Sequence, residues 1–261
     1  MKLITTQLPF SPIEDPFKVE HGGFYRRWLS MIDDIDYLKK VVSSITSTTE
    51  DIWVPIWKNH GKIFEEEGDA FARKGNKNEA RQKYLQAKTF YSIGRFPDLI
   101  TESKKEIHED CLRAFDKARQ WLNPPLKIVK INHKGKSIRC HLRQPLKKGK
   151  HPAVLIMCGA DVFKEDRAWA CDLAIENDMT GLVMDAPGTA ENPFHWEPES
   201  VSAWMEAIDY LANLQDVDES RIGAFGISRG GYSVMQLAGC YNNRVKAVVA
   251  NAGHPFGYKM T

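Results

Sequence analysis

From residue 123 onward the sequence alternates between short apolar runs and helical patterns, and this alternation restricts the fold more than any other feature. The apolar runs are PAVLIMCG, TGLVMDAPG, RIGAFGI and VKAVVANAG. The segments between them, such as ESVSAWMEAIDYLANLQ, have the spacing of amphipathic helices. Continuous apolar runs are typical of strands buried on both faces, and strands joined by helices run parallel. We therefore predict an α/β fold with a parallel sheet, preceded by a hairpin that turns at Lys134 and Gly135.

The chain before this region is predicted to be helical. Apolar residues follow helical spacing over residues 28–45, and two further helices are separated by Gly75 and Asn76. The small and aromatic residues around that break resemble one tetratricopeptide-type hairpin, but we favour two amphipathic helices packed on their neighbours. A fourth helix ends before Asn123-Pro124-Pro125. The expected division is a helical segment, 1–122, followed by the N-terminal part of an α/β core, 123–261.

Composition excludes several classes of protein. Apolar residues make up 43% and charged residues 27% of the 261 residues, and the net charge is +2, which argues against disorder and against nucleic-acid binding. No apolar run has the length of a membrane span, and the N-terminus is a poor signal peptide. The five cysteines are scattered and form no CxxC, so we expect reduced thiols in the cytoplasm and neither a disulfide frame nor a metal site.

A candidate nucleophile lies in RIGAFGISRGGYSVMQ, where an apolar strand meets a helix. Ser228 is flanked by Gly226 and Gly230 in the pattern GxSxG. In a tight strand-to-helix turn the serine is strained and its neighbours must be small, while the following backbone N–H and the helix N-terminus face the developing negative charge. We predict Ser228 as nucleophile and the N–H of Arg229 as an oxyanion donor.

The first long strand ends in MCGAD, and the loop after this strand supplies the second oxyanion donor in hydrolases of this kind. We assign that role to the N–H of Ala160. Asp161 would then lie at the mouth of the site, and we favour it as the N-cap of the next helix. Asp185, at the end of the second long strand, is either a catalytic carboxylate or, as we favour, the residue that holds its Pro-Gly turn.

Four stretches together resemble the FrsA-like esterases of the α/β-hydrolase fold, a group that includes dihydropseudooxynicotine hydrolases and fungal polyketide-shortening hydrolases. They are YSIGRFP, CGADVFKED, DAPGTA and GISRGGY. The resemblance covers nearly the whole chain. It implies that the helical segment is a cap over the active site. It also implies cleavage of esters, or of carbon–carbon bonds next to ketones, by a Ser-Asp-His triad without metal or organic cofactor.

The sequence departs from that pattern after Ser228. No Asp or Glu follows it, and the only later histidine is His254, whereas the fold places the triad acid and histidine in that order after the serine. His195 and His254 are candidates for a substitute base, with or without Asp185, but we favour surface or packing roles for both. We expect the chain to be the N-terminal two-thirds of a hydrolase. Its last strand, at Val245–Ala250, would then have an open edge that invites association.

The predicted reaction is attack of Ser228 Oγ on a carbonyl, followed by hydrolysis of the acyl-enzyme. Trp53, Trp57, Phe90, Tyr91 and Phe96 either line a pocket for a ring-bearing substrate or, as we favour, pack the helical core. Without its acid and histidine the chain alone is expected to be inactive. The alternatives are a non-catalytic interaction module, a homodimer, and half of a split hydrolase completed by a second, C-terminal chain. A nucleotide-binding domain is disfavoured because GxGxxG and P-loop patterns are absent.

Overall fold

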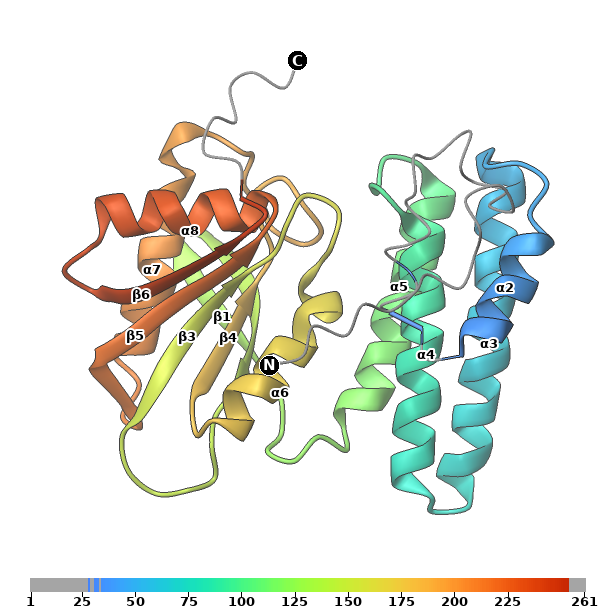
Figure 1. Cartoon of the computed structure of the whole chain (residues 1–261), viewed down its shortest axis with the longest axis horizontal. Helices are drawn as coiled ribbons and strands as arrows, with labels where there is room; N and C mark the ends of the chain where they lie inside the picture. The colour runs from blue at the N-terminus through green and yellow to red at the C-terminus, as the bar shows by residue number, and fades with distance from the viewer. Residues whose placement is uncertain (1–27, 29–30, 33, 254–261) are drawn as a thin grey trace, which may run out of the picture.

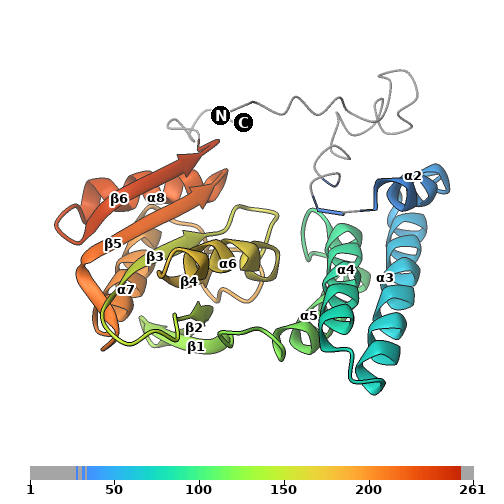
Figure 2. The same cartoon turned by 60° about the horizontal axis from the view of Figure 1, so that its bottom comes forward.

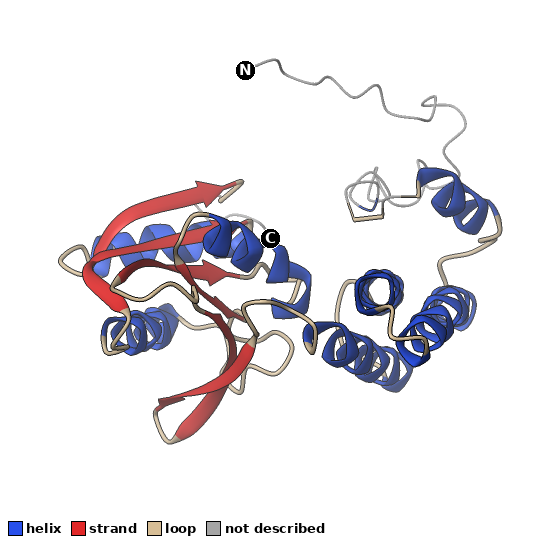
Figure 3. Cartoon of the chain, turned by 90° about the horizontal axis from the view of Figure 1, so that it is seen from below, coloured by secondary structure: helices blue, strands red, loops and turns tan. Residues whose placement is uncertain are grey.

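The computed structural model describes residues 28, 31–32 and 34–253. Figure 1 shows two parts side by side, a sheet flanked by helices and a bundle of helices. Seen from below, the helices of the bundle are viewed nearly end-on beside the sheet (Figure 3). None of the described helices is long and apolar enough to cross a membrane.

Within the described residues the bundle contains four helices, and it is called the helical segment below. They are α2 (Ile35–Ser43), α3 (Glu50–Arg73), α4 (Lys77–Arg95) and α5 (Glu102–Arg119). The break between α3 and α4 falls at Gly75, whose φ of 79° is a conformation that favours glycine. The small residues of this hairpin allow close packing, since Gly68 lies against the ring of Tyr84 and Gly61 against that of Tyr91. The tetratricopeptide-like spacing therefore serves packing within the segment.

Between residues 127 and 251 the chain forms a six-stranded sheet, in the order β1-β2-β4-β3-β5-β6. The strands are β1 (Lys127–His133), β2 (Lys136–Arg143), β3 (His151–Met157), β4 (Thr180–Met184), β5 (Val217–Ile227) and β6 (Val245–Asn251). β1, β2 and β4 pair antiparallel, whereas β4, β3, β5 and β6 pair parallel. The predicted hairpin forms, with positive φ at both Lys134 and Gly135. The predicted α/β fold class is confirmed.

Helices cover both faces of the middle of the sheet. They are α6 (Ala168–Glu176), α7 (Val201–Ala212) and α8 (Arg229–Cys240), with short 3₁₀ turns at Lys164–Arg167 and Pro198–Ser200. Alternate residues of β3 face opposite ways: Leu155 packs in the core with α7 and α8, and Ile156 packs with α6. In Figure 2, α6 lies in front of β3 and β4, and α7 and α8 lie behind. The central strands are therefore buried on both faces, as their continuous apolar runs predict.

The prediction that an apolar run is a strand buried on both faces is wrong for β6. Only Val245 of this strand is buried, and Val249 keeps 57% of its surface exposed. The strand pairs with β5 on one side, and α8 packs on one face. Trp169, Leu173 and Val249 are all exposed large apolar side chains, and the ring of Trp169 contacts that of Phe225 on β5. Burial depends on what covers a strand, which its own apolar run does not specify.

Candidate active site

Ser228 forms the turn between β5 and α8, and its backbone has an uncommon conformation. Its φ is 58° and its ψ is −122°, a combination that is strained for any residue with a Cβ. The Ser228 N–H donates to the carbonyl of Asn251 at 2.9 Å, which ties the turn to the end of β6. The predicted strand–turn–helix context of Ser228 is therefore present, at the carboxyl ends of the parallel strands.

The glycines on either side of Ser228 permit this turn. A Cβ on Gly226 would collide with the carbonyl oxygen of Gly230. A Cβ on Gly230 would lie 2.7 Å from the carbonyl oxygen of Cys158 and nearer still to that of Met157. Because these obstacles are backbone atoms, they cannot move aside as a flexible side chain can. The GxSxG pattern here thus reflects close backbone approach between α8 and the end of β3.

The loop that follows β3, residues 158–163, lies directly beside Ser228 and is called the β3 loop below. A Cβ built on Gly159 would be 3.6 Å from the Cβ of Ser228. The hydrogen bonds within residues 34–253 give no acceptor to the N–H of Ala160 or of Arg229. Two backbone donors near the serine thus have no acceptor within these residues.

A cavity of about 550 Å³ lies between the helical segment and the β3 loop. Its lining is largely apolar and aromatic, with two carboxylates and one ammonium group. The lining residues are Trp28, Thr48, Glu50, Trp53, Phe96, Pro97, Lys104 and Asp161. Since Asp161 is two residues from Gly159, the cavity lies close to the part of the β3 loop that contacts Ser228. A volume of this size suits a small organic molecule.

The five aromatic residues considered from the sequence lie at the cavity, in the apolar cluster of the helical segment, or in both. Trp53 and Phe96 line this cavity. Trp57, Phe90 and Tyr91 are almost wholly buried in the helical segment, where they belong to its apolar cluster. Trp53 is only 7% exposed and belongs to the same cluster, so packing accounts for four of them, and Phe96 lines the cavity without belonging to that cluster.

Asp185 is buried and engaged by Lys164. Its Oδ1 accepts the N–H of Lys164 at 2.7 Å, and its Oδ2 lies 2.9 Å from the Lys164 ammonium group. Burial raises the pKa of Asp185 to about 6, against the opposing effect of Lys164. The Lys164 ammonium also contacts Glu165 and Glu191. Asp185 therefore ties the end of β4 to the 3₁₀ turn at Lys164, and in the described residues its carboxylate has no hydrogen bond to its own Pro-Gly turn, which the sequence favoured.

Asp161 is not the cap of the following helix. The 3₁₀ turn begins at Lys164, and Phe163 occupies the N-cap position. The N–H of Phe163 donates to the carboxylate of Asp166 at 3.2 Å, so the acid that satisfies this end lies within the turn. This correction leaves Asp161 among the residues that line the cavity, the alternative place given to it from the sequence.

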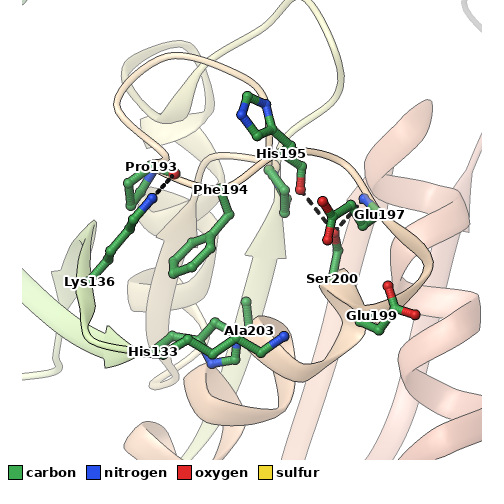
Figure 4. A pocket seen from close by; sticks show the side chains of 11 residues that line it. His133, Lys136, Pro193, Phe194, His195, Glu197, Glu199, Ser200 and Ala203 are labelled. Carbon is green, nitrogen blue, oxygen red and sulfur yellow. Dashed lines mark hydrogen bonds between the residues drawn. The ribbon is translucent and has the colours of Figure 1, made fainter.

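His195 lies in another pocket, of about 210 Å³, which shares no lining residue with the first. Figure 4 shows it with His133, Phe194 and Glu197, and with its backbone carbonyl accepting a hydrogen bond from Ser200. Within residues 34–253 no hydrogen bond joins His195 to Ser228 or Asp185, so the structure does not assemble a rearranged triad from them. His254 lies outside the described residues.

Sequence reasoning missed a cluster of charges between the helical segment and the sheet. Asp166 is buried and contacts three side chains of α4: Lys88 at 2.9 Å, Ser92 at 2.6 Å and Arg95 at 2.5 Å. Burial alone would raise the pKa of Asp166, but the two cations outweigh it and hold that pKa well below its usual value. The signal was present in the sequence, because Arg95 and Asp166 belong to two of the four family-like stretches. In the described residues no group of acids, histidines or cysteines is arranged to hold a metal.

Comparison with known proteins finds relatives that are named as esterases and hydrolases. Esterase FrsA of Vibrio cholerae serotype O1 is 25% identical over 236 residues, which cover 84% of this chain and 55% of that protein. The 2,6-dihydropseudooxynicotine hydrolase of Paenarthrobacter nicotinovorans is 22% identical over 215 residues, which cover 80% of this chain and 57% of that enzyme. The chain thus spans somewhat more than half the length of these relatives.

Two solved structures share the fold. The crystal structure of a 2,6-dihydroxy-pseudo-oxynicotine hydrolase matches with a TM-score of 0.68 at 21% identity, over 79% of this chain and 59% of that one. Wild-type AbyA5 matches with a TM-score of 0.73 at 20% identity, over 90% of this chain and 63% of that one. The family described as Esterase FrsA-like matches residues 34–256. The chain therefore belongs to the FrsA-like esterase family, with the fold of an α/β-hydrolase.

Proposed function

We propose that this chain carries the nucleophile, the oxyanion hole and the substrate cavity of a serine hydrolase that cleaves an ester or a carbon–carbon bond next to a ketone. The observation that carries the proposal is the strained turn at Ser228, against which the β3 loop packs at the rim of a cavity. A non-catalytic module would have no need of a strained serine beside two unbonded backbone donors. The names of the relatives, esterase and hydrolase, support the same reaction class.

In the proposed mechanism Ser228 Oγ attacks a carbonyl carbon, and the bond to the leaving group breaks to give an acyl-enzyme that water hydrolyses. The N–H groups of Ala160 and Arg229 stabilise the oxyanion. Loss of one such donor typically lowers the rate by about 10²–10³-fold. With a ketone substrate, the leaving group is a carbanion instead of an alkoxide, and the same groups serve.

The proton of Ser228 needs a base, and the described residues supply none in contact with it. No Asp or Glu follows Ser228 in the sequence, and His254 is the only later histidine. A serine without a base is a weak nucleophile at neutral pH. We therefore propose that the 261-residue chain is inactive alone and that a further polypeptide supplies the triad acid and histidine.

The cavity points to a substrate that carries a ring. Trp28, Trp53 and Phe96 offer aromatic surface on its wall, and Glu50, Lys104 and Asp161 offer polar groups. Aromatic walls with a few polar groups are typical of pockets for small organic ligands. The named relative that hydrolyses 2,6-dihydropseudooxynicotine is consistent with a ring-bearing substrate.

The test is the intact mass of the protein after incubation with a fluorophosphonate probe, with Ser228→Ala as control. Inactivity of the isolated chain predicts no adduct on either protein. A single adduct on the wild type alone would show that a base lies within this chain, and His195 and His254 would be the next residues to substitute. An adduct on both proteins would overturn the assignment of Ser228.

The uncovered face of β6 is a second feature with functional meaning. We propose that the apolar surface formed by Val249 of β6 with Phe225 of β5 and with Trp169 and Leu173 of α6 is covered by the polypeptide that completes the hydrolase. Support comes from its apolar exposure and from the greater length of the relatives. A homodimer through the same edge and a pure interaction module are the alternatives. Recovery of probe labelling on adding an FrsA-like C-terminal region would separate completion from both.

A further inference from the structure

The two stretches YSIGRFP and CGADVFKED are some 70 positions apart in the sequence, and in the structure Ser92 and Arg95 of the first bond Asp166 of the second. Arg95 ends α4 and is 1% exposed. We propose that Arg95 is a positioning residue that holds the β3 loop, and with it the Ala160 N–H, against Ser228. This inference rests on the proposed function, because it assigns Arg95 a role in shaping the oxyanion hole.

Three residues in or next to the β3 loop contact the guanidinium group of Arg95. Its Nη2 donates to the Asp166 carboxylate at 2.5 Å, and its Nη1 donates to the Asp161 carbonyl at 3.4 Å. The Cζ of the guanidinium lies over the Phe163 ring, 3.5 Å from its centroid. A planar group with several donors suits this arrangement, whereas a lysine ammonium could not stack and bond in the same way.

The β3 loop needs such a support because the sheet holds it only at its ends. The N–H of Cys158 donates to the Met184 carbonyl, and the N–H of Lys164 donates to Asp185. Between these anchors, the N–H groups of Gly159, Ala160 and Val162 donate to no acceptor in the described chain. The contact with the Asp161 carbonyl comes from the helical segment and falls within this interval.

The carboxylate of Asp166 holds the guanidinium in place through Nη2. It also binds Lys88 and Ser92 of α4, and it accepts the N–H of Phe163. The helical segment is thus connected to the reacting serine in a short series of contacts, from α4 through Arg95 and the β3 loop to Ser228. Accurate placement of an oxyanion donor depends on this kind of supporting contact.

The test compares Arg95→Met, Arg95→Lys and a control, Lys83→Met. Lys83 also lies on α4, but its partner is Glu67 and it does not touch the β3 loop. Hydrogen exchange is measured at the N–H groups of Cys158 and Lys164, whose acceptors are untouched, and at Ala224 of β5 as a reporter of global opening. The rate of fluorophosphonate labelling at Ser228 is measured on the chain alone and with an added FrsA-like C-terminal region.

For Arg95→Met we expect the hydrogen-exchange rates at Cys158 and Lys164 to rise about tenfold or more, while the rate at Ala224 is unchanged. In the samples in which the wild type is labelled, we expect the labelling rate of this variant to fall about tenfold or more. The exchange and labelling rates of Arg95→Lys should lie between those of the wild type and Arg95→Met. The rates of Lys83→Met should match those of the wild type. Unchanged exchange at the β3 loop, or an equal rise at Ala224, would overturn the positioning role and leave only a structural contact. If the wild type is labelled neither alone nor with the added C-terminal region, that result would count against the proposed function. The exchange data would still decide the role of Arg95.

Discussion

At the scale of single residues, the site is built by backbone conformations that most side chains would not permit. Ser228 has a positive φ, and Gly226 and Gly230 make room for the backbone around it. The strain at Ser228 persists because β5, β6 and α8 fix both ends of the turn, and strain of this kind is commonly found at reactive residues.

Replacing the serine by glycine should therefore stabilise the fold. We expect Ser228→Gly to raise the free energy of unfolding by about 1 kcal/mol, since glycine adopts this φ without strain. Ser228→Ala keeps the Cβ and should show no such gain. Urea denaturation of the three proteins measures the difference, and equal stability of the glycine and alanine variants would argue that the turn is unstrained.

Two of the three glycines of α8 give a matched pair for the packing argument. A Cβ on Gly230 meets backbone carbonyls, whereas one on Gly239 meets no atom within 4 Å. We expect Gly230→Ala to lower the free energy of unfolding by about 3 kcal/mol. Gly239→Ala should raise it by up to about 1 kcal/mol, because alanine is the better helix former. Thermal and urea unfolding provide the values, and similar effects at both positions would contradict the close approach at Gly230.

At the scale of elements, buried charges fix the loops that surround the site. Lys164 is almost fully buried among the carboxylates of Asp185, Glu165 and Glu191. Burial would lower its pKa, but these carboxylates outweigh that effect and raise it. Removing the ammonium group would leave buried carboxylates without a counter-charge.

Accordingly, Lys164→Met should lower the free energy of unfolding by about 3–5 kcal/mol. Lys147→Met is the control, because Lys147 pairs with Asp178 at the surface and should change stability by less than about 1 kcal/mol. If urea denaturation gave the two variants the same stability, the cluster would not be holding these loops. Limited proteolysis of the folded variants would report on the loops themselves.

Two histidines between α5 and the sheet should make stability depend on pH. Burial lowers the pKa of His108 and of His141 to about 4, from an ordinary value of 6.5. The unfolded chain binds these protons at higher pH than the folded one, so their contribution falls as the pH is lowered from about 6.5 to about 4. Between about pH 7 and pH 5 the loss is about 2 kcal/mol per histidine.

The measurement compares wild type with a His108→Leu, His141→Leu double variant by urea denaturation at several pH values. The comparison is needed because the raised pKa of Asp185 acts in the opposite sense over part of this range. The free energy of unfolding of the variant should depend less on pH between about 4 and 6.5. Parallel pH curves for the two proteins would contradict buried, neutral histidines.

At the scale of the whole molecule, the edge of the sheet formed by β6 is more exposed than the central strands. β6 exposes Val249 and the backbone groups that would pair with another strand, beside the apolar side chains of Trp169 and Leu173. Exposed apolar edge strands promote association. The chain should therefore self-associate in the absence of the polypeptide that we propose covers this face.

We expect Val249→Lys to reduce that association, because a charge on the exposed face opposes burial in an interface. Light scattering over a concentration series gives the oligomeric state. Ile63→Lys is the matched control, since Ile63 is an exposed apolar residue of α3 in the helical segment. A monomeric wild type at all concentrations, or an equal effect of both substitutions, would exclude the edge as the contact.

The sequence by itself determined the elements, the α/β class and the position of Ser228 at a strand-to-helix turn. These follow from local information, since the hydrophobic period and the glycine spacing involve residues that are close together in the sequence. Only the tertiary structure decided which faces are covered and which charges meet. It exposed β6, it placed Asp161 at a cavity instead of a helix cap, and it joined Arg95 to Asp166. Such contacts link distant positions, and their energies depend on burial that no local pattern specifies.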